Sequence, residues 1–283
     1  METYITNSIL MLGTSGILIA LILSLAAKKF KVETDPRKDK ILEILPGANC
    51  GACGYPGCEQ YAAALVEKNI EVNLCKPGGQ EVAKKIGEIL GKNASDTQRM
   101  VAVVMCGGGI RAKDEFVYSG IKRCDIANKY YDGQKLCKYG CLGFGDCVEV
   151  CPFDAIHINQ YGVAEVDPIK CTGCRLCVKA CPKNIIKLVP CTYQVHILCS
   201  SKDKGVFVRQ VCSVGCIGCG LCVKACPVND IVLQNNLASM KYDKCNNCGA
   251  CVIKCPTKCI VSLLDINSQI KAEVKNFSLG IAK

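Results

Sequence analysis

The sequence has no tryptophan, and its aromatic residues make up only 6% of 283 positions. Histidine is also scarce, with two copies. Large aromatic side chains normally supply much of a buried core, so this chain must fill part of its interior in another way. The two histidines, His157 and His196, lie in apolar stretches with strand-like alternation. We expect both to be packing residues and not metal ligands.

Charged residues are absent from a twenty-residue segment, Ser8 to Ala27, which is about the length that spans a hydrocarbon core. No Lys or Arg precedes it, whereas signal peptides begin with basic residues and have a shorter apolar region. Three lysines follow between positions 28 and 31. The segment therefore predicts a retained single-pass anchor in the lipid of the cell (inner) membrane, with the N-terminus outside and the remainder in the cytoplasm.

Motifs for substrate chemistry are missing as well. The sequence shows no nucleophile–base pairing, dinucleotide fingerprint or flavin motif. The glycines at 107–109 lack the strand, helix and following Lys-Ser/Thr of a phosphate-binding loop, so we interpret them as a turn. We expect no substrate-transforming site in the chain itself.

Cysteine is abundant, with 26 copies. Three blocks, beginning at Cys171, Cys216 and Cys245, share the spacing Cys-x2-Cys-x2-Cys-x3-Cys-Pro, which is typical of bacterial ferredoxins with [4Fe–4S] clusters. Disulfides belong to oxidising compartments, and structural zinc usually uses two well-separated Cys-x2-Cys pairs, so neither explains the blocks well. Several clusters in one chain indicate an electron conduit, and the clusters would also replace part of an ordinary core.

Crossed ligation predicts the ligands of three clusters, because the last cysteine of a block binds the cluster of its partner block. Between the blocks of each pair, alternating residues predict a β-hairpin, at 155–166 and at 231–240. The second pair repeats the plan of the first, which indicates an internal duplication. The predicted sets are Cys151, Cys171, Cys174 and Cys177; Cys216, Cys219, Cys222 and Cys255; and Cys226, Cys245, Cys248 and Cys251.

The block that precedes Cys171 departs from this spacing. Aligned with the second pair, it has Phe144 where that pair has Cys219. The nearest substitute is Cys137, so the fourth predicted set is Cys137, Cys141, Cys147 and Cys181. If Cys137 cannot reach, a three-iron cluster or a fourth ligand other than cysteine is the alternative.

Six cysteines remain outside the regular sets. The segment around Cys106 resembles the one around Cys199, which extends the duplication upstream. Two interpretations stay open for four of the six: a further site between the repeats, or buried free thiols. Cys191 and Cys259 are expected to be structural thiols. The candidate ligands of the further site are Cys106, Cys124, Cys199 and Cys212.

A separate cysteine cluster precedes the ferredoxin blocks in a glycine-rich segment. Its glycines let the backbone turn tightly and direct N–H groups toward sulfur. Amphipathic helices are predicted at 59–68, between Cys58 and Cys75, and at 79–90, after Cys75. A small zinc knuckle would not need so many glycines, so we expect a [4Fe–4S] site and a total of five clusters, or six with the further site. The ligands would be Cys50, Cys53, Cys58 and Cys75.

The formal net charge of +10 does not indicate a nucleic-acid partner. An oxidised cubane cluster with four thiolates carries about −2, so five clusters would contribute about −10. The holoprotein would then be nearly neutral. A basic surface for nucleic acid is therefore not expected.

The apolar N-terminal helix, the charged linker, the CGACGYPGC and CKPGG segments and the paired ferredoxin blocks together resemble the B subunit of the Rnf complex. That family is a membrane-bound, ion-translocating ferredoxin:NAD oxidoreductase, and the resemblance covers essentially the whole chain. It implies a subunit that takes electrons from reduced soluble ferredoxin and passes them to other subunits of the complex. The alternatives are an electron-transfer subunit of another membrane oxidoreductase, such as a hydrogenase-linked complex, and a structural or regulatory iron–sulfur protein.

The expected fold is α+β, with a transmembrane helix, a small helical [4Fe–4S] domain and two tandem ferredoxin-like modules. The linker shows no helical apolar periodicity. The predicted boundaries are 1–27 for the anchor, 28–40 for the linker, 41–95 for the first cluster domain, 96–190 for the first module with its upstream extension, and 191–283 for the second module and tail.

Overall fold

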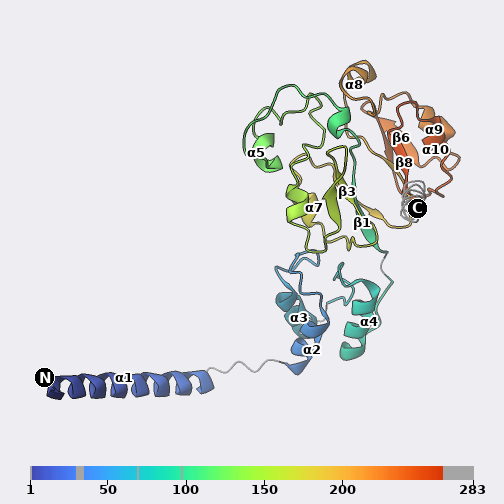
Figure 1. Ribbon diagram of the computed structural model, residues 1–283. Helices are drawn as coiled ribbons and strands as arrows, with labels where there is room; N and C mark the ends of the chain where they lie inside the picture. Colours follow the sequence, from blue (N-terminus) through green and yellow to red (C-terminus); the bar gives the residue numbers. More distant parts are fainter. Residues whose placement is uncertain (1, 30–34, 69, 97, 264–283) are drawn as a thin grey trace, which may run out of the picture.

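The computed structural model describes residues 2–29, 35–68, 70–96 and 98–263. Figure 1 shows a separate N-terminal helix, a small helical domain and, beyond it, two modules that contain strands. This mixture of helices and strands confirms the predicted α+β class. Residues 30–34 of the predicted linker and the predicted tail from 264 onward lie outside the described residues.

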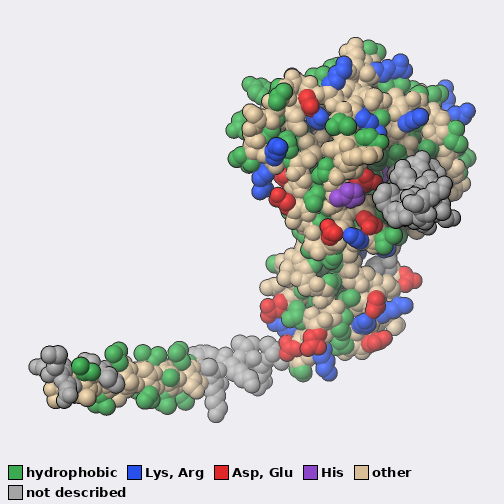
Figure 2. All heavy atoms as spheres, in the orientation of Figure 1, with side chains coloured by type: hydrophobic (Ala, Val, Ile, Leu, Met, Phe, Trp, Pro, Cys, Tyr) green, Lys and Arg blue, Asp and Glu red, His purple; other side chains and the backbone are tan. Residues whose placement is uncertain are grey.

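Helix α1 (Glu2–Lys29) carries the predicted membrane segment. Its stretch Ile5–Ala26 has a mean hydropathy of 2.4, and none of the tested window is buried against the protein. Figure 2 shows hydrophobic side chains along this helix and charged side chains over the rest of the molecule. Among the described residues, α1 is the one helix whose length and composition suit a membrane span.

The small domain contains α2 (Pro36–Ile44), α3 (Cys58–Glu67) and α4 (Gly79–Leu90). Their apolar faces meet in a core that includes Ile41, Tyr61, Leu65, Val72 and Ile86. The helices predicted at 59–68 and 79–90 are thereby confirmed.

Helix α2 begins inside the segment predicted to be a linker. Asp35 accepts a hydrogen bond from the backbone N–H of Arg37, and Pro36 occupies the first helical turn. An Asp cap followed by proline strongly favours the start of a helix. Apolar periodicity alone does not reveal this start. Only Ile41 of this short helix is buried.

The first module is built around two antiparallel strand pairs. Strands β2 (Ile156–Ile158) and β3 (Ala164–Val166) form the predicted hairpin, while β1 (Met100–Val104) pairs with β4 (Ile186–Pro190). The connecting segments hold the 3-10 helix η1 (Gly109–Arg111) and short helices. These helices are α5 (Cys124–Asn128), α6 (Asp146–Glu149) and α7 (Leu176–Ala180).

The second module repeats this arrangement. Strands β6 (Ile231–Gln234) and β7 (Leu237–Met240) form its hairpin, and β5 (Val195–Ile197) pairs with β8 (Ile260–Ser262). At the hairpin turn, Asn235 and Asn236 have φ of 48° and 60°, as a turn with two left-handed residues requires. The module also contains α8 (Gly205–Val211), α9 (Leu221–Ala225) and α10 (Ala250–Lys254).

The two histidines differ in their environment. His196 on β5 is fully buried, which confirms its prediction as a packing residue. His157 on β2 is exposed, between the buried Ile156 and the half-buried Ile158. The expectation for His157 was wrong because β2 belongs to a hairpin with one face toward solvent, where alternate side chains point outward.

An aspartate caps the turn before the last cysteine block of each module, but from different positions. In the first module, Asp167 accepts hydrogen bonds from the N–H groups of Ile169 and Lys170. In the second, the buried Asp230 lies across the hairpin and accepts hydrogen bonds from the N–H groups of residues 242, 243 and 244. The two turns are equivalent, but the aspartate that caps each one comes from a different position in its module.

Replacing Asp230 with Ala should lower the free energy of unfolding by about 2–4 kcal/mol, because three backbone donors lose a charged, buried acceptor. Thermal denaturation of the anaerobic holoprotein, followed by circular dichroism, should then shift down by about 5–10 °C. The exposed Asp243 in the same turn provides the control, and Asp243→Ala should change stability by less than about 0.5 kcal/mol. Equal effects of the two substitutions would contradict the role assigned to Asp230.

Candidate metal centres

The four cysteines of the small domain line one cavity: Cys50, Cys53, Cys58 and Cys75. The loop before α3 supplies the first two, and Asn49 fixes the start of α3 by accepting the N–H of Cys58. Gly51 and Gly54 have φ of 69° and 89°, which tight turning around a group requires. Burial, and then the neighbouring cysteines Cys58, Cys53 and Cys50, raise the pKa of Cys75 to about 11.

One local geometry recurs in all four ferredoxin-type blocks. The third cysteine is the second residue of a short helix: Cys147 in α6, Cys177 in α7, Cys222 in α9 and Cys251 in α10. The residue before each helix is left-handed, with φ between 69° and 91°. This reversal turns the helix N-terminus, with its free N–H groups, toward the space that the sulfurs face.

The electrostatic effect of each cysteine on its neighbours is consistent with the three regular sets, and one of them, Cys216, Cys219, Cys222 and Cys255, also lines a single cavity. In each set, burial is the main cause that raises the pKa of the helix cysteine, and its three predicted partners add to the effect. The pKa of Cys177 is raised to about 12, with Cys171, Cys174 and Cys151 contributing. Those of Cys222 and Cys251 are raised to about 11, with contributions from Cys216, Cys219 and Cys255 and from Cys245, Cys226 and Cys248.

The fourth ferredoxin-type cavity differs from the predicted set. It is lined by Cys124, Cys141, Cys147 and Cys181. Burial raises the pKa of Cys147 to about 12, and Cys141, Cys124 and Cys181 add to it. Cys137, the expected fourth member, lines another cavity.

A hydrogen-bonded contact brings Cys124 to this cavity. The buried carboxylate of Asp146, at the start of α6, accepts the N–H groups of Cys124 and Asp125 at 2.7 and 3.0 Å. These are the first residues of α5, so Asp146 joins α5 to the helix that carries Cys147. Phe144, which replaces a cysteine in the alignment, packs against Tyr118 with ring centroids 5.5 Å apart.

A signal for Cys124 exists in the sequence. The separation from Cys106 to Cys137 exceeds the equivalent separation from Cys199 to Cys212 by 18 positions. Cys124 lies within this insertion. The module that lacks the middle cysteine of its block therefore carries an additional cysteine elsewhere.

The cysteines of each cavity are spaced for an iron–sulfur cluster and not for a single metal ion. Among the described residues, no three His, Cys, Asp or Glu side chains gather tightly enough for a single metal ion. The cavities are instead lined by four or more cysteines that approach from different sides, together with apolar side chains. A [4Fe–4S] group, in which each thiolate binds a separate iron, fits such a set of donors.

Cys259 is a fifth cysteine at one cavity. It lies with Cys216, Cys219, Cys222 and Cys255, and its Sγ is 3.6 Å from that of Cys255. The hydrogen bond with the Cys259 thiol lowers the pKa of Cys255 to about 5. Cys259 is thus placed to donate to a ligand sulfur.

Hydrogen bonds to ligand sulfurs raise the potential of a cluster, so Cys259→Val should make one potential more negative. A net loss of about 0.5–1 kcal/mol corresponds to about 20–40 mV for one electron. Redox titration with electron paramagnetic resonance would measure the shift. Cys191→Val is the control and should leave all potentials unchanged. Loss of a whole cluster in Cys259→Val would show instead that Cys259 is a ligand.

Three family models match the chain. One described as a putative Fe-S cluster covers residues 45–77. One 4Fe-4S dicluster domain matches 210–256, and another matches 136–185 and 170–230. The matches extend over the small domain and both modules, and [4Fe–4S] clusters are the cofactors of the chain.

Curated relatives extend this similarity to most of the chain. The B subunit of the Na(+)-translocating ferredoxin:NAD(+) oxidoreductase complex of Acetobacterium woodii is 45% identical, over 88% of this chain and 75% of its own length. The B subunit of the ion-translocating oxidoreductase complex of Methanosarcina acetivorans is 41% identical, over 87% and 93%. The B subunit of the proton-translocating ferredoxin:NAD(+) oxidoreductase complex of Clostridium ljungdahlii is 42% identical, over 91% and 93%. The chain therefore belongs to the B-subunit family of Rnf-type ion-translocating oxidoreductase complexes and is an electron-relaying iron–sulfur subunit.

Proposed function

We propose that the protein accepts single electrons from reduced ferredoxin and carries them through a row of [4Fe–4S] clusters to neighbouring subunits of a membrane complex. Two of the relatives are named for ferredoxin:NAD(+) oxidoreductase complexes. Clusters ligated only by cysteine commonly have potentials near about −400 mV, which suits a ferredoxin donor. The chain itself transforms no substrate.

We assign five ligand sets, on the basis of the cavities and the mutual effects of the thiols. Four are the sets expected from the spacing, and in the remaining one Cys124 takes the place of Cys137. The sets are the first-domain set, Cys50, Cys53, Cys58 and Cys75; the variant set, Cys124, Cys141, Cys147 and Cys181; the central set, Cys151, Cys171, Cys174 and Cys177; the inner set, Cys216, Cys219, Cys222 and Cys255; and the outer set, Cys226, Cys245, Cys248 and Cys251.

Successive ligand sets lie close together. A Cβ on Gly51, next to Cys50, would lie 4.0 Å from Lys179 Nζ in α7. Burial is the main cause that raises the pKa of Cys174, and the nearby Cys50 raises it further. This effect supports a first-domain set that lies beside the central set. Cys177 of the central set also acts on Cys147 of the variant set. Neighbouring clusters can exchange electrons directly. Clusters with a purely structural role would not need to lie in a row.

The two ends of the row differ in their surroundings. Cys219 and Cys248, in the second module, are exposed, so their clusters lie near the protein surface. The first-domain set lies at the other end, on the domain that follows the membrane helix. We assign ferredoxin docking to the second module and delivery of electrons to the membrane partners from the first domain.

The lysines at the C-terminal end of α1 favour an N-terminus outside and cluster domains in the cytoplasm, in contact with lipid only through α1. Relatives of similar identity are named for different ions, Na(+) and the proton. One candidate spanning helix is present in the described residues. We therefore assign the ion pathway to other subunits, with this one supplying electrons.

Removing one ligand of the central set tests the relay. Cys174→Ala should lose about four irons per chain, and ferredoxin-dependent NAD reduction by the assembled complex should fall below about a tenth of wild type, because the row is interrupted beside the first domain. Cys191→Ala removes a thiol outside the five sets and should keep both iron and activity. Full activity in a Cys174→Ala complex that has lost its cluster would rule out a linear relay.

A further inference from the structure

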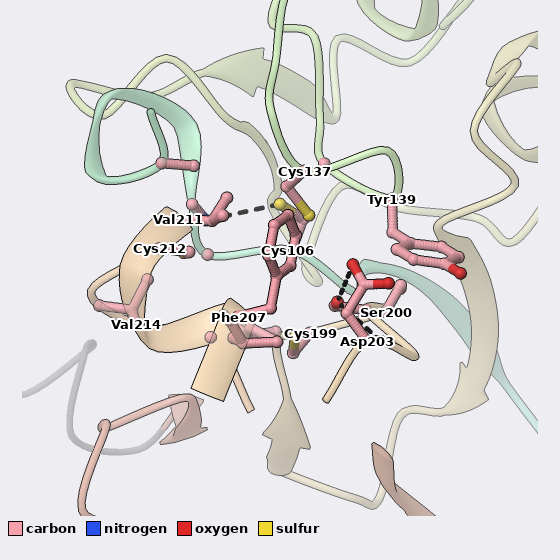
Figure 3. Close-up of a pocket in the computed structure, with 18 residues that line it drawn as sticks. Cys106, Cys137, Tyr139, Cys199, Ser200, Asp203, Phe207, Val211, Cys212 and Val214 are labelled. Carbon is pink, nitrogen blue, oxygen red and sulfur yellow. Dashed lines mark hydrogen bonds between the residues drawn. The ribbon is translucent and has the colours of Figure 1, made fainter. Parts of the chain in front are cut away.

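A cavity between the two modules is lined by four cysteines that none of the five sets uses. Figure 3 shows these cysteines around the cavity, with Phe207 and Asp203 at its border. Each module contributes two of them, one just after an upstream strand and one just before its first block. They are Cys106 and Cys137 from the first module and Cys199 and Cys212 from the second.

We propose that Cys106, Cys137, Cys199 and Cys212 hold a sixth [4Fe–4S] cluster, which joins the two modules. The site itself stands on geometry, and only its place in electron transfer rests on the proposed function. It also differs from the further site expected from the sequence, because Cys124 and Cys137 have exchanged places.

The internal duplication gives the site an approximate twofold symmetry. Cys106 corresponds to Cys199, and each sulfur accepts a hydrogen bond from the equivalent backbone N–H. The N–H of Cys141 lies 3.3 Å from Cys106 Sγ, and the N–H of Cys216 lies 3.2 Å from Cys199 Sγ. Such N–H groups stabilise thiolate and cluster sulfur. Two repeats therefore present the same donor geometry to one shared space.

Hydrogen bonds between the modules fix the two halves of the cavity. The N–H of Gly107 donates to the carbonyl of Leu198 at 2.9 Å, and the hydroxyl of Ser200 donates to the carbonyl of Met105 at 2.8 Å. On the other side, Ala112 pairs with Cys212 in an antiparallel bridge. Cys106, Cys199 and Cys212 are therefore held by backbone contacts at or beside them.

Two glycines border the space between the sulfurs. A Cβ on Gly108 would lie in van der Waals contact with Cys212 Sγ at 3.6 Å and Cys106 Sγ at 3.7 Å, and one on Gly140 would lie 3.8 Å from Cys137 Sγ. The backbone at both positions therefore lies close to the sulfurs. Phe207, Val208 and Val211 supply apolar walls, which protect a cluster from water.

Binding of a [4Fe–4S] core with charge about +2 would release four protons and leave a site of charge about −2. The guanidinium of Arg111 donates a hydrogen bond to the carbonyl of Gly107, next to Cys106, so it would partly offset this negative charge, while Asp203 also lines the cavity.

The site also completes the row of clusters. Cys141 belongs to the variant set and Cys216 to the inner set, and their N–H groups contact opposite sides of the new site. The order from the first domain is then first-domain, central, variant, sixth, inner and outer. A cluster here would lie between the variant set of the first module and the inner set of the second. Without it, these two sets would be separated by protein with no redox centre between them.

The test is the iron and sulfide content of the full-length protein, purified anaerobically, together with its cluster count by native mass spectrometry. Six clusters require about 24 irons per chain and five require about 20. Cys212→Ala should lose about four irons, with the electron paramagnetic resonance signals of the other clusters retained. Cys191→Ala should lose none. About 20 irons in the wild type, with none lost in Cys212→Ala, would overturn the proposal and leave four free thiols.

Double substitutions identify which cysteines share a cluster. If Cys137 and Cys212 bind the same one, Cys137→Ala combined with Cys212→Ala should lose only about four irons, whereas Cys124→Ala combined with Cys212→Ala should lose about eight. The opposite pattern would overturn the assignment. If these variants do not fold, the wild-type count still decides between five clusters and six. The proposed electron-transfer function has its own test. It would be contradicted if the Cys174→Ala complex kept its activity after losing a cluster, whatever the number of clusters in the wild type.

Discussion

Each ferredoxin-type centre requires cysteine sulfurs from separated parts of the chain to bind one inorganic cluster. This requirement constrains how the surrounding strands and helices are arranged. Cys181 must reach the space beside Cys147, and Cys255 must reach that of Cys222. The strands near these cysteines are three to five residues long and form two-stranded sheets, which are only marginally stable without further packing. The absence of tryptophan is consistent with this, since clusters occupy the space where large side chains would otherwise pack.

The sequence predicts those parts of the centres that are encoded in local spacing. The regular blocks, the hairpins and the first-domain cysteines follow from short-range patterns, and the structure brings their cysteines together as expected. Cys124 could not be placed in this way because its position depends on a tertiary contact, the capping of α5 by Asp146. The exposure of His157 likewise depends on which face of a hairpin meets the core.

Comparison of the two modules shows that the duplication retains geometry more strictly than residue position. In the first module, Cys124 from an insertion lines the cavity, whereas in the second module Cys219 of the block lines the equivalent cavity. Asp167 and Asp230 cap equivalent turns from different strand ends. In both cases the two modules have the same chemical group at the equivalent place in the structure, a cysteine sulfur in one case and an aspartate carboxylate in the other, although the residue that supplies it differs. An alignment of positions alone therefore predicts Cys137 as the partner of Cys141 and Cys147, whereas the cavity that contains these two cysteines also contains Cys124.

Electrostatics links the number of clusters to the composition of the chain. The polypeptide carries a formal charge of +10, and each cluster with its four thiolates contributes about −2. Five clusters would make the holoprotein nearly neutral, and a sixth would make it slightly acidic, at about −2. The excess of lysine and arginine would thus balance the negative charge of the clusters. Arg111 illustrates this locally, because its guanidinium donates to the carbonyl of Gly107, which lines the cavity between the modules.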